Sequence, residues 1–158
     1  MRWTFFCFTI AIVIAAPAIA IAQDGSVSAI FEKHKMIGVF AEDCGKPASP
    51  SNPYYVHRAI DPNHVQRDIM EGPTLRARFT MVEKAGIVAP NEISNAGPLS
   101  GSIGSASFDR TPTDAILRVD ANRFRFIEIT LAGRKLAANG RYTGNGQETP
   151  WFNRCGGG

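Results

Sequence analysis

The stretch that decides the fold is Tyr54–Met70, with the sequence YYVHRAIDPNHVQRDIM. Two runs rich in β-branched and aromatic residues, 54–60 and 64–70, flank the short polar segment Asp61-Pro62-Asn63. Pro62 suits the second position of a type I turn, because its ring fixes φ near the value that this position needs. The stretch therefore predicts a β-hairpin with one tight turn.

Further strand-like segments lie downstream of this hairpin. Residues 75–82 alternate, with Leu75, Ala77, Phe79 and Met81 on one side. Two more hairpins are predicted, 115–119 with 124–131 and 135–138 with 141–143, the latter joined by Asn139-Gly140, a strong two-residue turn pattern. Residues 92–94 are a weaker strand candidate. The segment 95–107 is mostly Gly, Ser, Ala and Pro, so a flexible loop or a poorly packed edge is expected there.

Upstream, residues 26–35 predict a short helix that Ser26 or Ser28 could cap, and residues 36–41 predict a strand. The chain of 158 residues holds 15 Gly and 10 Pro, which fits many turns. About eight short strands joined mostly by tight turns imply an antiparallel meander, whose edges are best hidden by closure. We predict a mainly β fold, a small antiparallel meander barrel with an N-terminal helix, in one domain over residues 23–158. A two-sheet sandwich is the alternative.

Residues 1–22 have the layout of a secretory signal peptide: Arg2, an apolar run over 3–14, and small residues before a polar segment that starts at Gln23. A membrane anchor is the alternative, since the apolar run approaches the ~20 residues that span a bilayer. Pro17 and the polar exit favour cleavage. The mature chain is then periplasmic or secreted, with no membrane span. Its net charge falls from +3 to +2 on loss of Arg2. This charge is too small to indicate nucleic-acid binding, which usually goes with a strongly basic domain.

Two cysteines, Cys44 and Cys155, remain after Cys7 leaves with the leader. Two thiols in an oxidising compartment usually pair, so a disulfide is predicted between the start of the fold and its last residues. A metal-binding or redox role is the alternative, but it lacks a Cys-x-x-Cys motif and nearby histidines.

The chain resembles a family of small exported proteins from soil-living alphaproteobacteria, a family that brings no activity to transfer. The resembling segments are GVFAEDC at 38–44, KP at 46–47, NPY at 52–54, HVQRDIM at 64–70, PNEIS at 90–94, NGRY at 139–142 and WFNRC at 151–155. There is also a faint likeness to lipocalin-type barrels, whose first strand follows a short helix and carries Gly-x-Trp. Here Phe40 stands at the third position, which weakens what this likeness implies about ligand binding.

The hairpin yields the main candidate site. If the turn pairs Asp61 with His64, residues whose numbers sum to 125 face each other, so Arg58 faces Arg67 on an otherwise apolar face. Unpaired buried guanidinium groups are costly. The pair could bind an anionic ligand, could be neutralised internally by Glu128 or Glu42, or could be exposed if the register slips by one residue. The candidate ligand-binding residues are Arg58, Arg67, Tyr54, Phe40 and Glu128.

Other chemistry finds little support in the sequence. The same register puts His57 opposite Asp68 and on the same face as His64. A His pair with a carboxylate could bind zinc, but the two histidines would lie well apart along the strands, and a polar solvent-facing side explains the same residues. No metal or cofactor is predicted. No Ser-x-x-Lys or Gly-x-Ser-x-Gly motif occurs. Tyr54, Tyr55, Trp151 and Phe152 could form a ligand surface or plug a barrel end.

The sequence thus favours a non-catalytic exported protein that binds a small amphipathic or anionic ligand. The alternative is an envelope protein-interaction or structural module with a filled core. The partner would be a small molecule in the first case and an envelope protein in the second.

Overall fold

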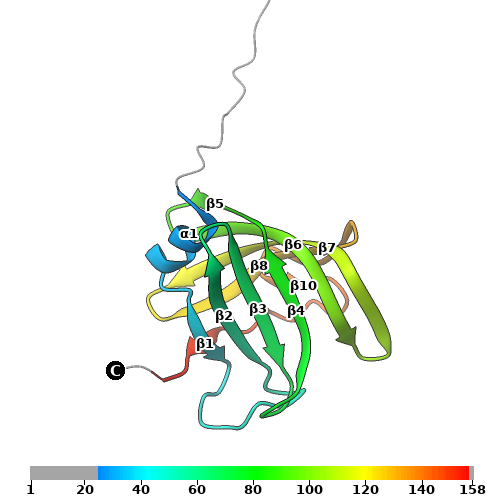
Figure 1. The fold of residues 1–158 in the computed structure, drawn as a ribbon. Coiled ribbons are helices and arrows are strands. Elements are labelled where there is room, and N and C mark those ends of the chain that lie inside the picture. The colour runs from blue at the N-terminus through cyan, green and yellow to red at the C-terminus, as the bar shows by residue number, and fades with distance from the viewer. Residues whose placement is uncertain (1–24, 157–158) are drawn as a thin grey trace, which may run out of the picture.

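The ring of strands closes on itself in the computed structural model, which describes residues 25–156 (Figure 1). Each strand of the closed barrel is antiparallel to both neighbours. The eight strands of the ring, in spatial order, are β1 (Gly38–Ala41), β2 (Tyr54–Asp61), β3 (His64–Met70), β4 (Arg76–Val82), β6 (Glu92–Ile103), β7 (Ala106–Asp120), β8 (Arg123–Leu131) and β11 (Phe152–Arg154). The predicted meander barrel is confirmed, and the two-sheet sandwich is wrong.

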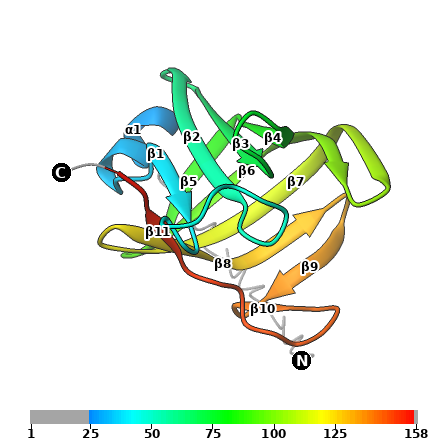
Figure 2. The ribbon, with the colours of Figure 1, turned by 90° about the horizontal axis from the view of Figure 1, so that it is seen from below.

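Three further strands extend the walls. β5 (Lys84–Ala89) continues from β4 after Glu83 and pairs with the first half of β6. β9 (Arg134–Ala138) and β10 (Arg141–Tyr142) form the predicted hairpin at Asn139-Gly140, and β9 pairs with the end of β8. The short β11 lies between β8 and β1 and completes the ring (Figure 2).

Helix α1 (Val27–Lys33), the one helix within residues 25–156, lies across one end of the barrel (Figure 1). Ser26 caps it by accepting the Ala29 N–H at 3.3 Å, as the sequence predicted. Ser28 donates its hydroxyl to the Asp61 carbonyl, which fixes the helix to the β2–β3 turn. Val27, Ile30 and Phe31 are buried. The helix therefore closes this end with apolar side chains.

The predicted disulfide is present. Cys44 and Cys155 are 111 residues apart in sequence, and their Cα atoms are 5.3 Å apart. Cys44 lies three residues after the end of β1, and Cys155 directly follows β11. The bond therefore lies beside the two residue pairs through which β1 and β11 close the barrel. The predicted signal peptide, residues 1–22, lies outside the described residues. Within residues 25–156, no helix is long and apolar enough to cross a membrane.

Residues 95–107 are not a flexible loop, which was one of the two alternatives predicted for them. They form most of β6 and the start of β7, a hairpin that projects beyond the neighbouring strands (Figure 1). Their small side chains serve a close contact between strands. A Cβ atom at Gly97 would lie 1.8 Å from the Met81 carbonyl oxygen. Small residues here mark a close approach of backbones rather than flexibility.

The predicted register of the first hairpin is also wrong, by one residue. The turn does pair Asp61 with His64, but a bulge between Ala59 and Asp61 shifts the ladder, so that Ala59 pairs with Val65 and His57 with Arg67. One extra residue in one strand moves every later side chain to the other face. Arg58 and Arg67 therefore point to opposite sides of the sheet and do not face each other.

The core fills the half of the barrel that lies next to α1. Its aromatic rings pack edge-on or tilted, with neighbouring centroids 4.5 to 6.2 Å apart, a favourable geometry. The rings belong to Phe31, Phe40, Tyr55, His57, Phe124, Phe126 and Phe152. The other half of the barrel is less completely filled.

Candidate functional site: a cavity in the barrel

A cavity of about 250 Å³ occupies the half of the barrel away from α1. The alternation of each strand explains its wall, because every second side chain points inward. From β3 these are Arg67 and Ile69, and from β4 they are Arg78 and Thr80. The remaining lining residues are Tyr55, Leu99, Ile103, Thr113, Ala115, Phe126, Ile129, Leu131, Leu136 and Tyr142.

Arg67 is the cation at the inner end of this cavity, and only 3% of it is exposed. Its Nε donates to His57 Nε2 at 3.0 Å, and its Nη2 donates to Asn95 Oδ1 at 2.9 Å. Both acceptors are neutral. A guanidinium has five N–H donors, and these two bonds use two of them. Within residues 25–156, Nη1 has no hydrogen-bond partner and no carboxylate forms an ion pair with Arg67.

His57 holds Arg67 in place from the aromatic core. Since a guanidinium only donates hydrogen bonds, Nε2 of His57 must be an unprotonated acceptor. Its Nδ1 lies 2.7 Å from the Met36 carbonyl oxygen and donates to it. Burial, followed by the charge of Arg67, holds the pKa of His57 well below its usual value. The imidazole is therefore neutral and the charge of the pair belongs to Arg67.

Burial lowers the pKa of Arg67 to about 10, so the guanidinium is still charged at neutral pH. An isolated buried charge is costly unless an opposite charge or polar groups compensate it. Here the described part of the chain supplies two neutral acceptors and no anion. The arrangement leaves a positive charge on the cavity wall.

Two tyrosines add polar donors to the wall. Burial raises the pKa of Tyr55 to about 12, and burial also raises the pKa of Tyr142. Both phenols therefore stay protonated at neutral pH. In the described part of the chain neither hydroxyl has a hydrogen-bond partner. Tyr55 and Arg67 line the same cavity.

Arg78 is the second cation of the wall, and it is already neutralised. Its Nη1 lies 2.5 Å from Glu71 Oε1 and 3.3 Å from the Ser102 carbonyl oxygen. The side chains of this pair are mostly buried, with 15% of Arg78 and 24% of Glu71 exposed. The net charge that the cavity wall carries is thus close to that of Arg67 alone.

The cavity changes character along the barrel axis. Arg67 lies in the middle of β3, near Ala115 and Phe126, toward the filled half. Ile103 lies at the tip of the β6–β7 hairpin and is 41% exposed. Arg78 lies nearer this tip, since it pairs with Gly101 and its Nη1 binds the Ser102 carbonyl. The uncompensated cation is thus at the inner end, and the outer end carries Ile103 and the Arg78–Glu71 ion pair.

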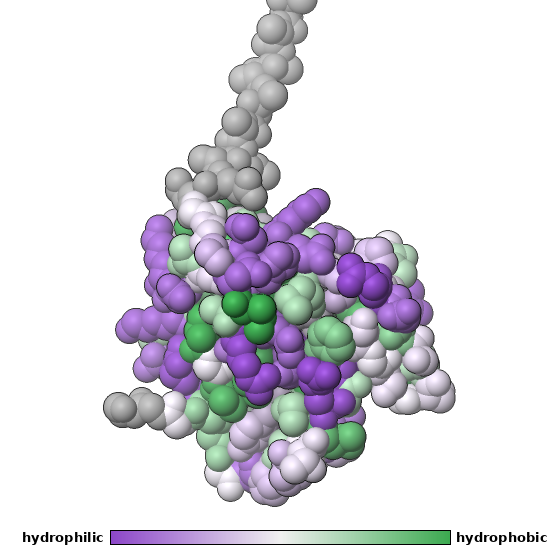
Figure 3. Space-filling view, viewed as in Figure 1, coloured by the Kyte–Doolittle hydropathy of each residue, from purple (hydrophilic) through white to green (hydrophobic). Residues whose placement is uncertain are grey.

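Of the five candidate residues predicted from sequence, only Arg67 lines the cavity. Arg58 lies on the outer wall, where it forms an ion pair with Asp68 that Arg76 joins at 3.3 Å. Glu128 does not line the cavity and pairs with Lys135 at 3.1 Å. Neither Glu128 nor Glu42 neutralises Arg58 or Arg67, so the predicted internal partners are wrong. On the face seen in Figure 3, hydrophobic and hydrophilic side chains are interspersed.

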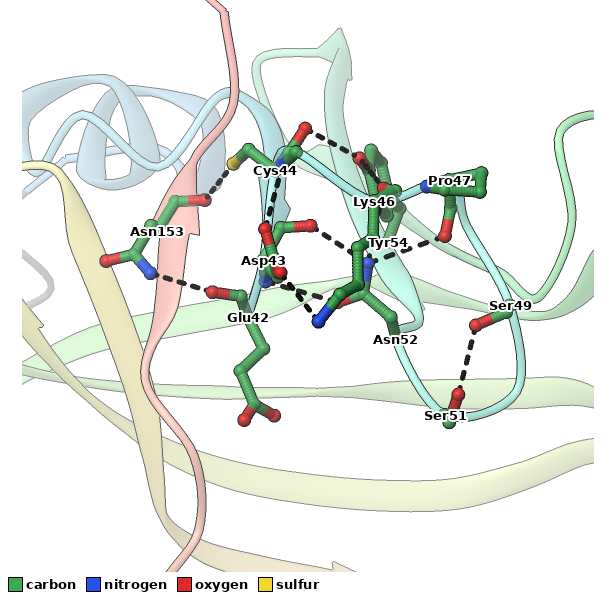
Figure 4. Close-up of polar contacts among 11 residues, drawn as sticks. Glu42, Asp43, Cys44, Lys46, Pro47, Ser49, Ser51, Asn52, Tyr54 and Asn153 are labelled. Carbon is green, nitrogen blue, oxygen red and sulfur yellow. Dashed lines mark hydrogen bonds and ion pairs between the residues drawn. The ribbon is translucent and has the colours of Figure 1, made fainter.

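Tyr54 and Phe40 have structural surroundings. The Tyr54 hydroxyl donates to the Lys46 carbonyl at 2.6 Å, in the loop between β1 and β2 (Figure 4). Phe40 is buried in the aromatic core against Phe124, with ring centroids 5.3 Å apart. Neither side chain lines the cavity.

His57 and His64, the two histidines considered as a zinc pair, have different surroundings. His57 is buried, whereas His64 is partly exposed and binds Asp61 at 2.7 Å. In residues 25–156, no group of three or more His, Cys, Asp or Glu side chains is placed to hold a metal ion.

Sequence reasoning missed Arg78, Tyr142 and the Asn95 bond. The alternation of β4 did place Arg78 and Thr80 on one side, but nothing in the sequence marked that side as the interior. Tyr55 was one of four aromatic residues that the sequence suggested as a ligand surface, and it is the one of the four that lines the cavity.

Comparison of this chain with protein-family models, with curated proteins and with solved structures gave no match.

Proposed function

We propose that this chain is an exported, non-catalytic binding protein whose barrel cavity holds a small amphipathic molecule by an anionic group. The observation that carries the proposal is Arg67, a buried cation that lines a cavity of about 250 Å³ and has no anionic partner among residues 25–156. Ligand pockets are mostly apolar with a few polar groups that orient the ligand. The Leu and Ile side chains around Arg67 fit that description.

Export is part of the proposal. A disulfide persists in oxidising compartments and is rare in the cytosol, so the Cys44–Cys155 bond supports a periplasmic or secreted location. The leader predicted over residues 1–22 is the second support.

The proposal is tested by incubating the purified mature protein with cell extract and identifying retained small molecules by mass spectrometry. Wild type, Arg67→Met and the control Arg58→Met are compared. Both variants lose one arginine of the same hairpin, but only Arg67 lines the cavity. We expect wild type and Arg58→Met to retain an acidic, partly apolar compound and Arg67→Met to retain none. Equal retention by all three proteins, or no retention by wild type, would overturn the proposal.

An envelope protein-interaction or structural module is the second candidate. It is favoured by the filled half of the barrel and by a cavity slightly smaller than the range of about 300 to 1,000 Å³ that is typical of ligand pockets. The projecting β6–β7 hairpin would then be the contact segment. A protein of this kind would retain a protein partner and no small molecule, so the same experiment separates the two candidates.

A further inference from the structure

We infer that the cavity selects a ligand with a single negative charge, an alkyl or aryl monocarboxylate, and binds it with the carboxylate innermost. This inference rests on the proposed function and goes further, because it fixes the charge, the head group and the orientation of the ligand. Three features of the wall support it.

The first feature is charge. Arg78 and Glu71 compensate each other at 2.5 Å, and Arg67 is left with neutral partners. A ligand that carries one negative charge therefore makes the occupied cavity neutral. A dianion such as a phosphate monoester would leave one negative charge in a low-dielectric site, which is costly.

The second feature is the set of free donors. Arg67 keeps three N–H groups after its bonds to His57 and Asn95, including both on Nη1. Tyr55, whose phenol is a further donor, lines the same cavity. A carboxylate has two oxygens in one plane, and a guanidinium binds it through two parallel N–H···O bonds. These donors can satisfy both oxygens.

The third feature is the position of the cation. Arg67 is at the inner end of the cavity, while the exposed end carries Ile103. The reverse orientation would place an alkyl tail against an uncompensated guanidinium. It would also place the carboxylate near Arg78, whose partner Glu71 would repel it. The carboxylate therefore lies inside and the tail points outward.

The experiment uses isothermal titration calorimetry of the mature, oxidised protein at pH 8 with octanoate, octanol and octyl phosphate. The three probes share one alkyl chain and carry about −1, 0 and −2 charges at this pH. We expect octanoate to bind at least tenfold more tightly than either of the others, since hydrogen bonds to a charged group are among the strong ones. Arg67→Met should lose this preference, and Arg58→Met should keep it.

A charge variant tests the same inference in the opposite direction. Glu71→Gln leaves Arg78 without its anion, so the wall gains a second uncompensated cation. We expect this variant to bind octyl phosphate at least tenfold more tightly than wild type does. Glu83→Gln is the matched control, because Glu83 pairs with Arg110 at 3.8 Å and does not line the cavity. If Glu71→Gln does not fold, the relative affinities of wild type for octanoate, octanol and octyl phosphate still test the monocarboxylate inference.

The orientation has its own probe, 8-hydroxyoctanoate, whose added hydroxyl is at the far end of the tail. With the tail at the exposed end, we expect its affinity to stay within about threefold of that of octanoate. A loss of tenfold or more would show a buried tail end and overturn the orientation.

The outcomes distinguish a failure of the proposed function from a failure of the monocarboxylate inference. If wild type binds none of the probes and retains nothing from extract, the proposed function fails. If wild type binds octanol or octyl phosphate as tightly as octanoate, the cavity binds ligands but the monocarboxylate inference is wrong. Failure of Glu71→Gln to gain affinity, with a folded protein, would contradict the charge argument alone.

Discussion

His57 and Arg67 face each other in the β2–β3 ladder, and the imidazole accepts the Nε–H of the guanidinium at 3.0 Å. Both side chains are almost wholly buried, with exposed fractions of 1% and 3%. Two cations in contact in such a place would be very costly. The pair is instead one cation and one neutral acceptor, and this division has consequences that can be measured.

We expect the free energy of unfolding to fall as pH decreases below about 6.5. The unfolded chain binds a proton at His57 near this pH, but the folded chain does not, because the folded pKa is held well below its usual value. Stability that is present above the unfolded pKa is therefore lost as pH falls toward the folded one. The slope from this group is at most roughly 1.4 kcal/mol per pH unit.

Urea unfolding of wild type and His57→Gln between pH 7 and pH 5 measures this slope. Glutamine is neutral at both pH values, so the variant should lack the part of the slope that His57 contributes. Identical slopes in the two proteins would mean that folded His57 takes up its proton normally.

Gly97→Ala should destabilise the barrel strongly. The new Cβ would lie 1.8 Å from the Met81 carbonyl oxygen, so β6 would have to move away from the β4–β5 bend. Overpacking of this kind costs about 1–3 kcal/mol, and more when the obstacle is backbone. Thermal unfolding measures the loss. Gly144→Ala is the control, since no atom lies within 4 Å of its added Cβ and its φ is not positive. Equal melting temperatures for the two variants would contradict the close approach.

Removal of the disulfide should cost several kcal/mol. In the chain-entropy model, a closed loop of about 100 residues is worth about 4.7 kcal/mol, and Cys44 and Cys155 are 111 residues apart. Urea unfolding of the oxidised protein and of the Cys44→Ala, Cys155→Ala double variant gives the difference. A loss below about 1 kcal/mol would show that the barrel closes without help from the bond.

The Asn52 side chain should be needed for the ordered conformation of the loop between β1 and β2 (Figure 4). Its carboxamide accepts the Asp43 N–H at 3.1 Å and donates to the carbonyls of Asp43 and Lys46 at 2.9 and 3.3 Å. It is only 6% exposed, so Asn52→Ala leaves partly buried backbone groups unpaired, at a cost of about 1–3 kcal/mol.

Hydrogen exchange of the loop amides, with Ser51→Ala as control, measures this effect. Ser51 is exposed and bonds only the Ser49 hydroxyl. We expect faster exchange at Asp43 in Asn52→Ala than in the control. Unchanged exchange would show that the loop is ordered without the Asn52 side chain, by contacts such as the Tyr54 hydroxyl on the Lys46 carbonyl.

The sequence predicted the architecture well because the turns are local. Asn139-Gly140 and Asp61-Pro62-Asn63 specify their hairpins through residues that are adjacent in the chain. The disulfide was predictable because only two cysteines, Cys44 and Cys155, follow residue 22. Each of these inferences depends on a few neighbouring residues or on a simple count.

The register and the site were not predictable in the same way. A bulge beside Ile60 adds one residue without changing the turn, and no local pattern marks it, yet it decides whether Arg58 or His57 faces inward. Small residues at 95–107 fit a loop as well as a close approach of strands, and only the position of Met81 distinguishes the two. The partners of Arg67 come from β2 and β6, so their identity depends on the closed fold.

The barrel has a filled half next to α1 and a half that holds the cavity. The aromatic rings beside α1 form the buried core on which folding depends, whereas the outer end of the cavity carries Ile103, which is 41% exposed. If the proposed ligand binding is right, substitutions at this outer end would change which molecule the cavity holds at a small cost to folding, because little apolar surface is buried there. Such a scaffold would keep its architecture while its specificity changed.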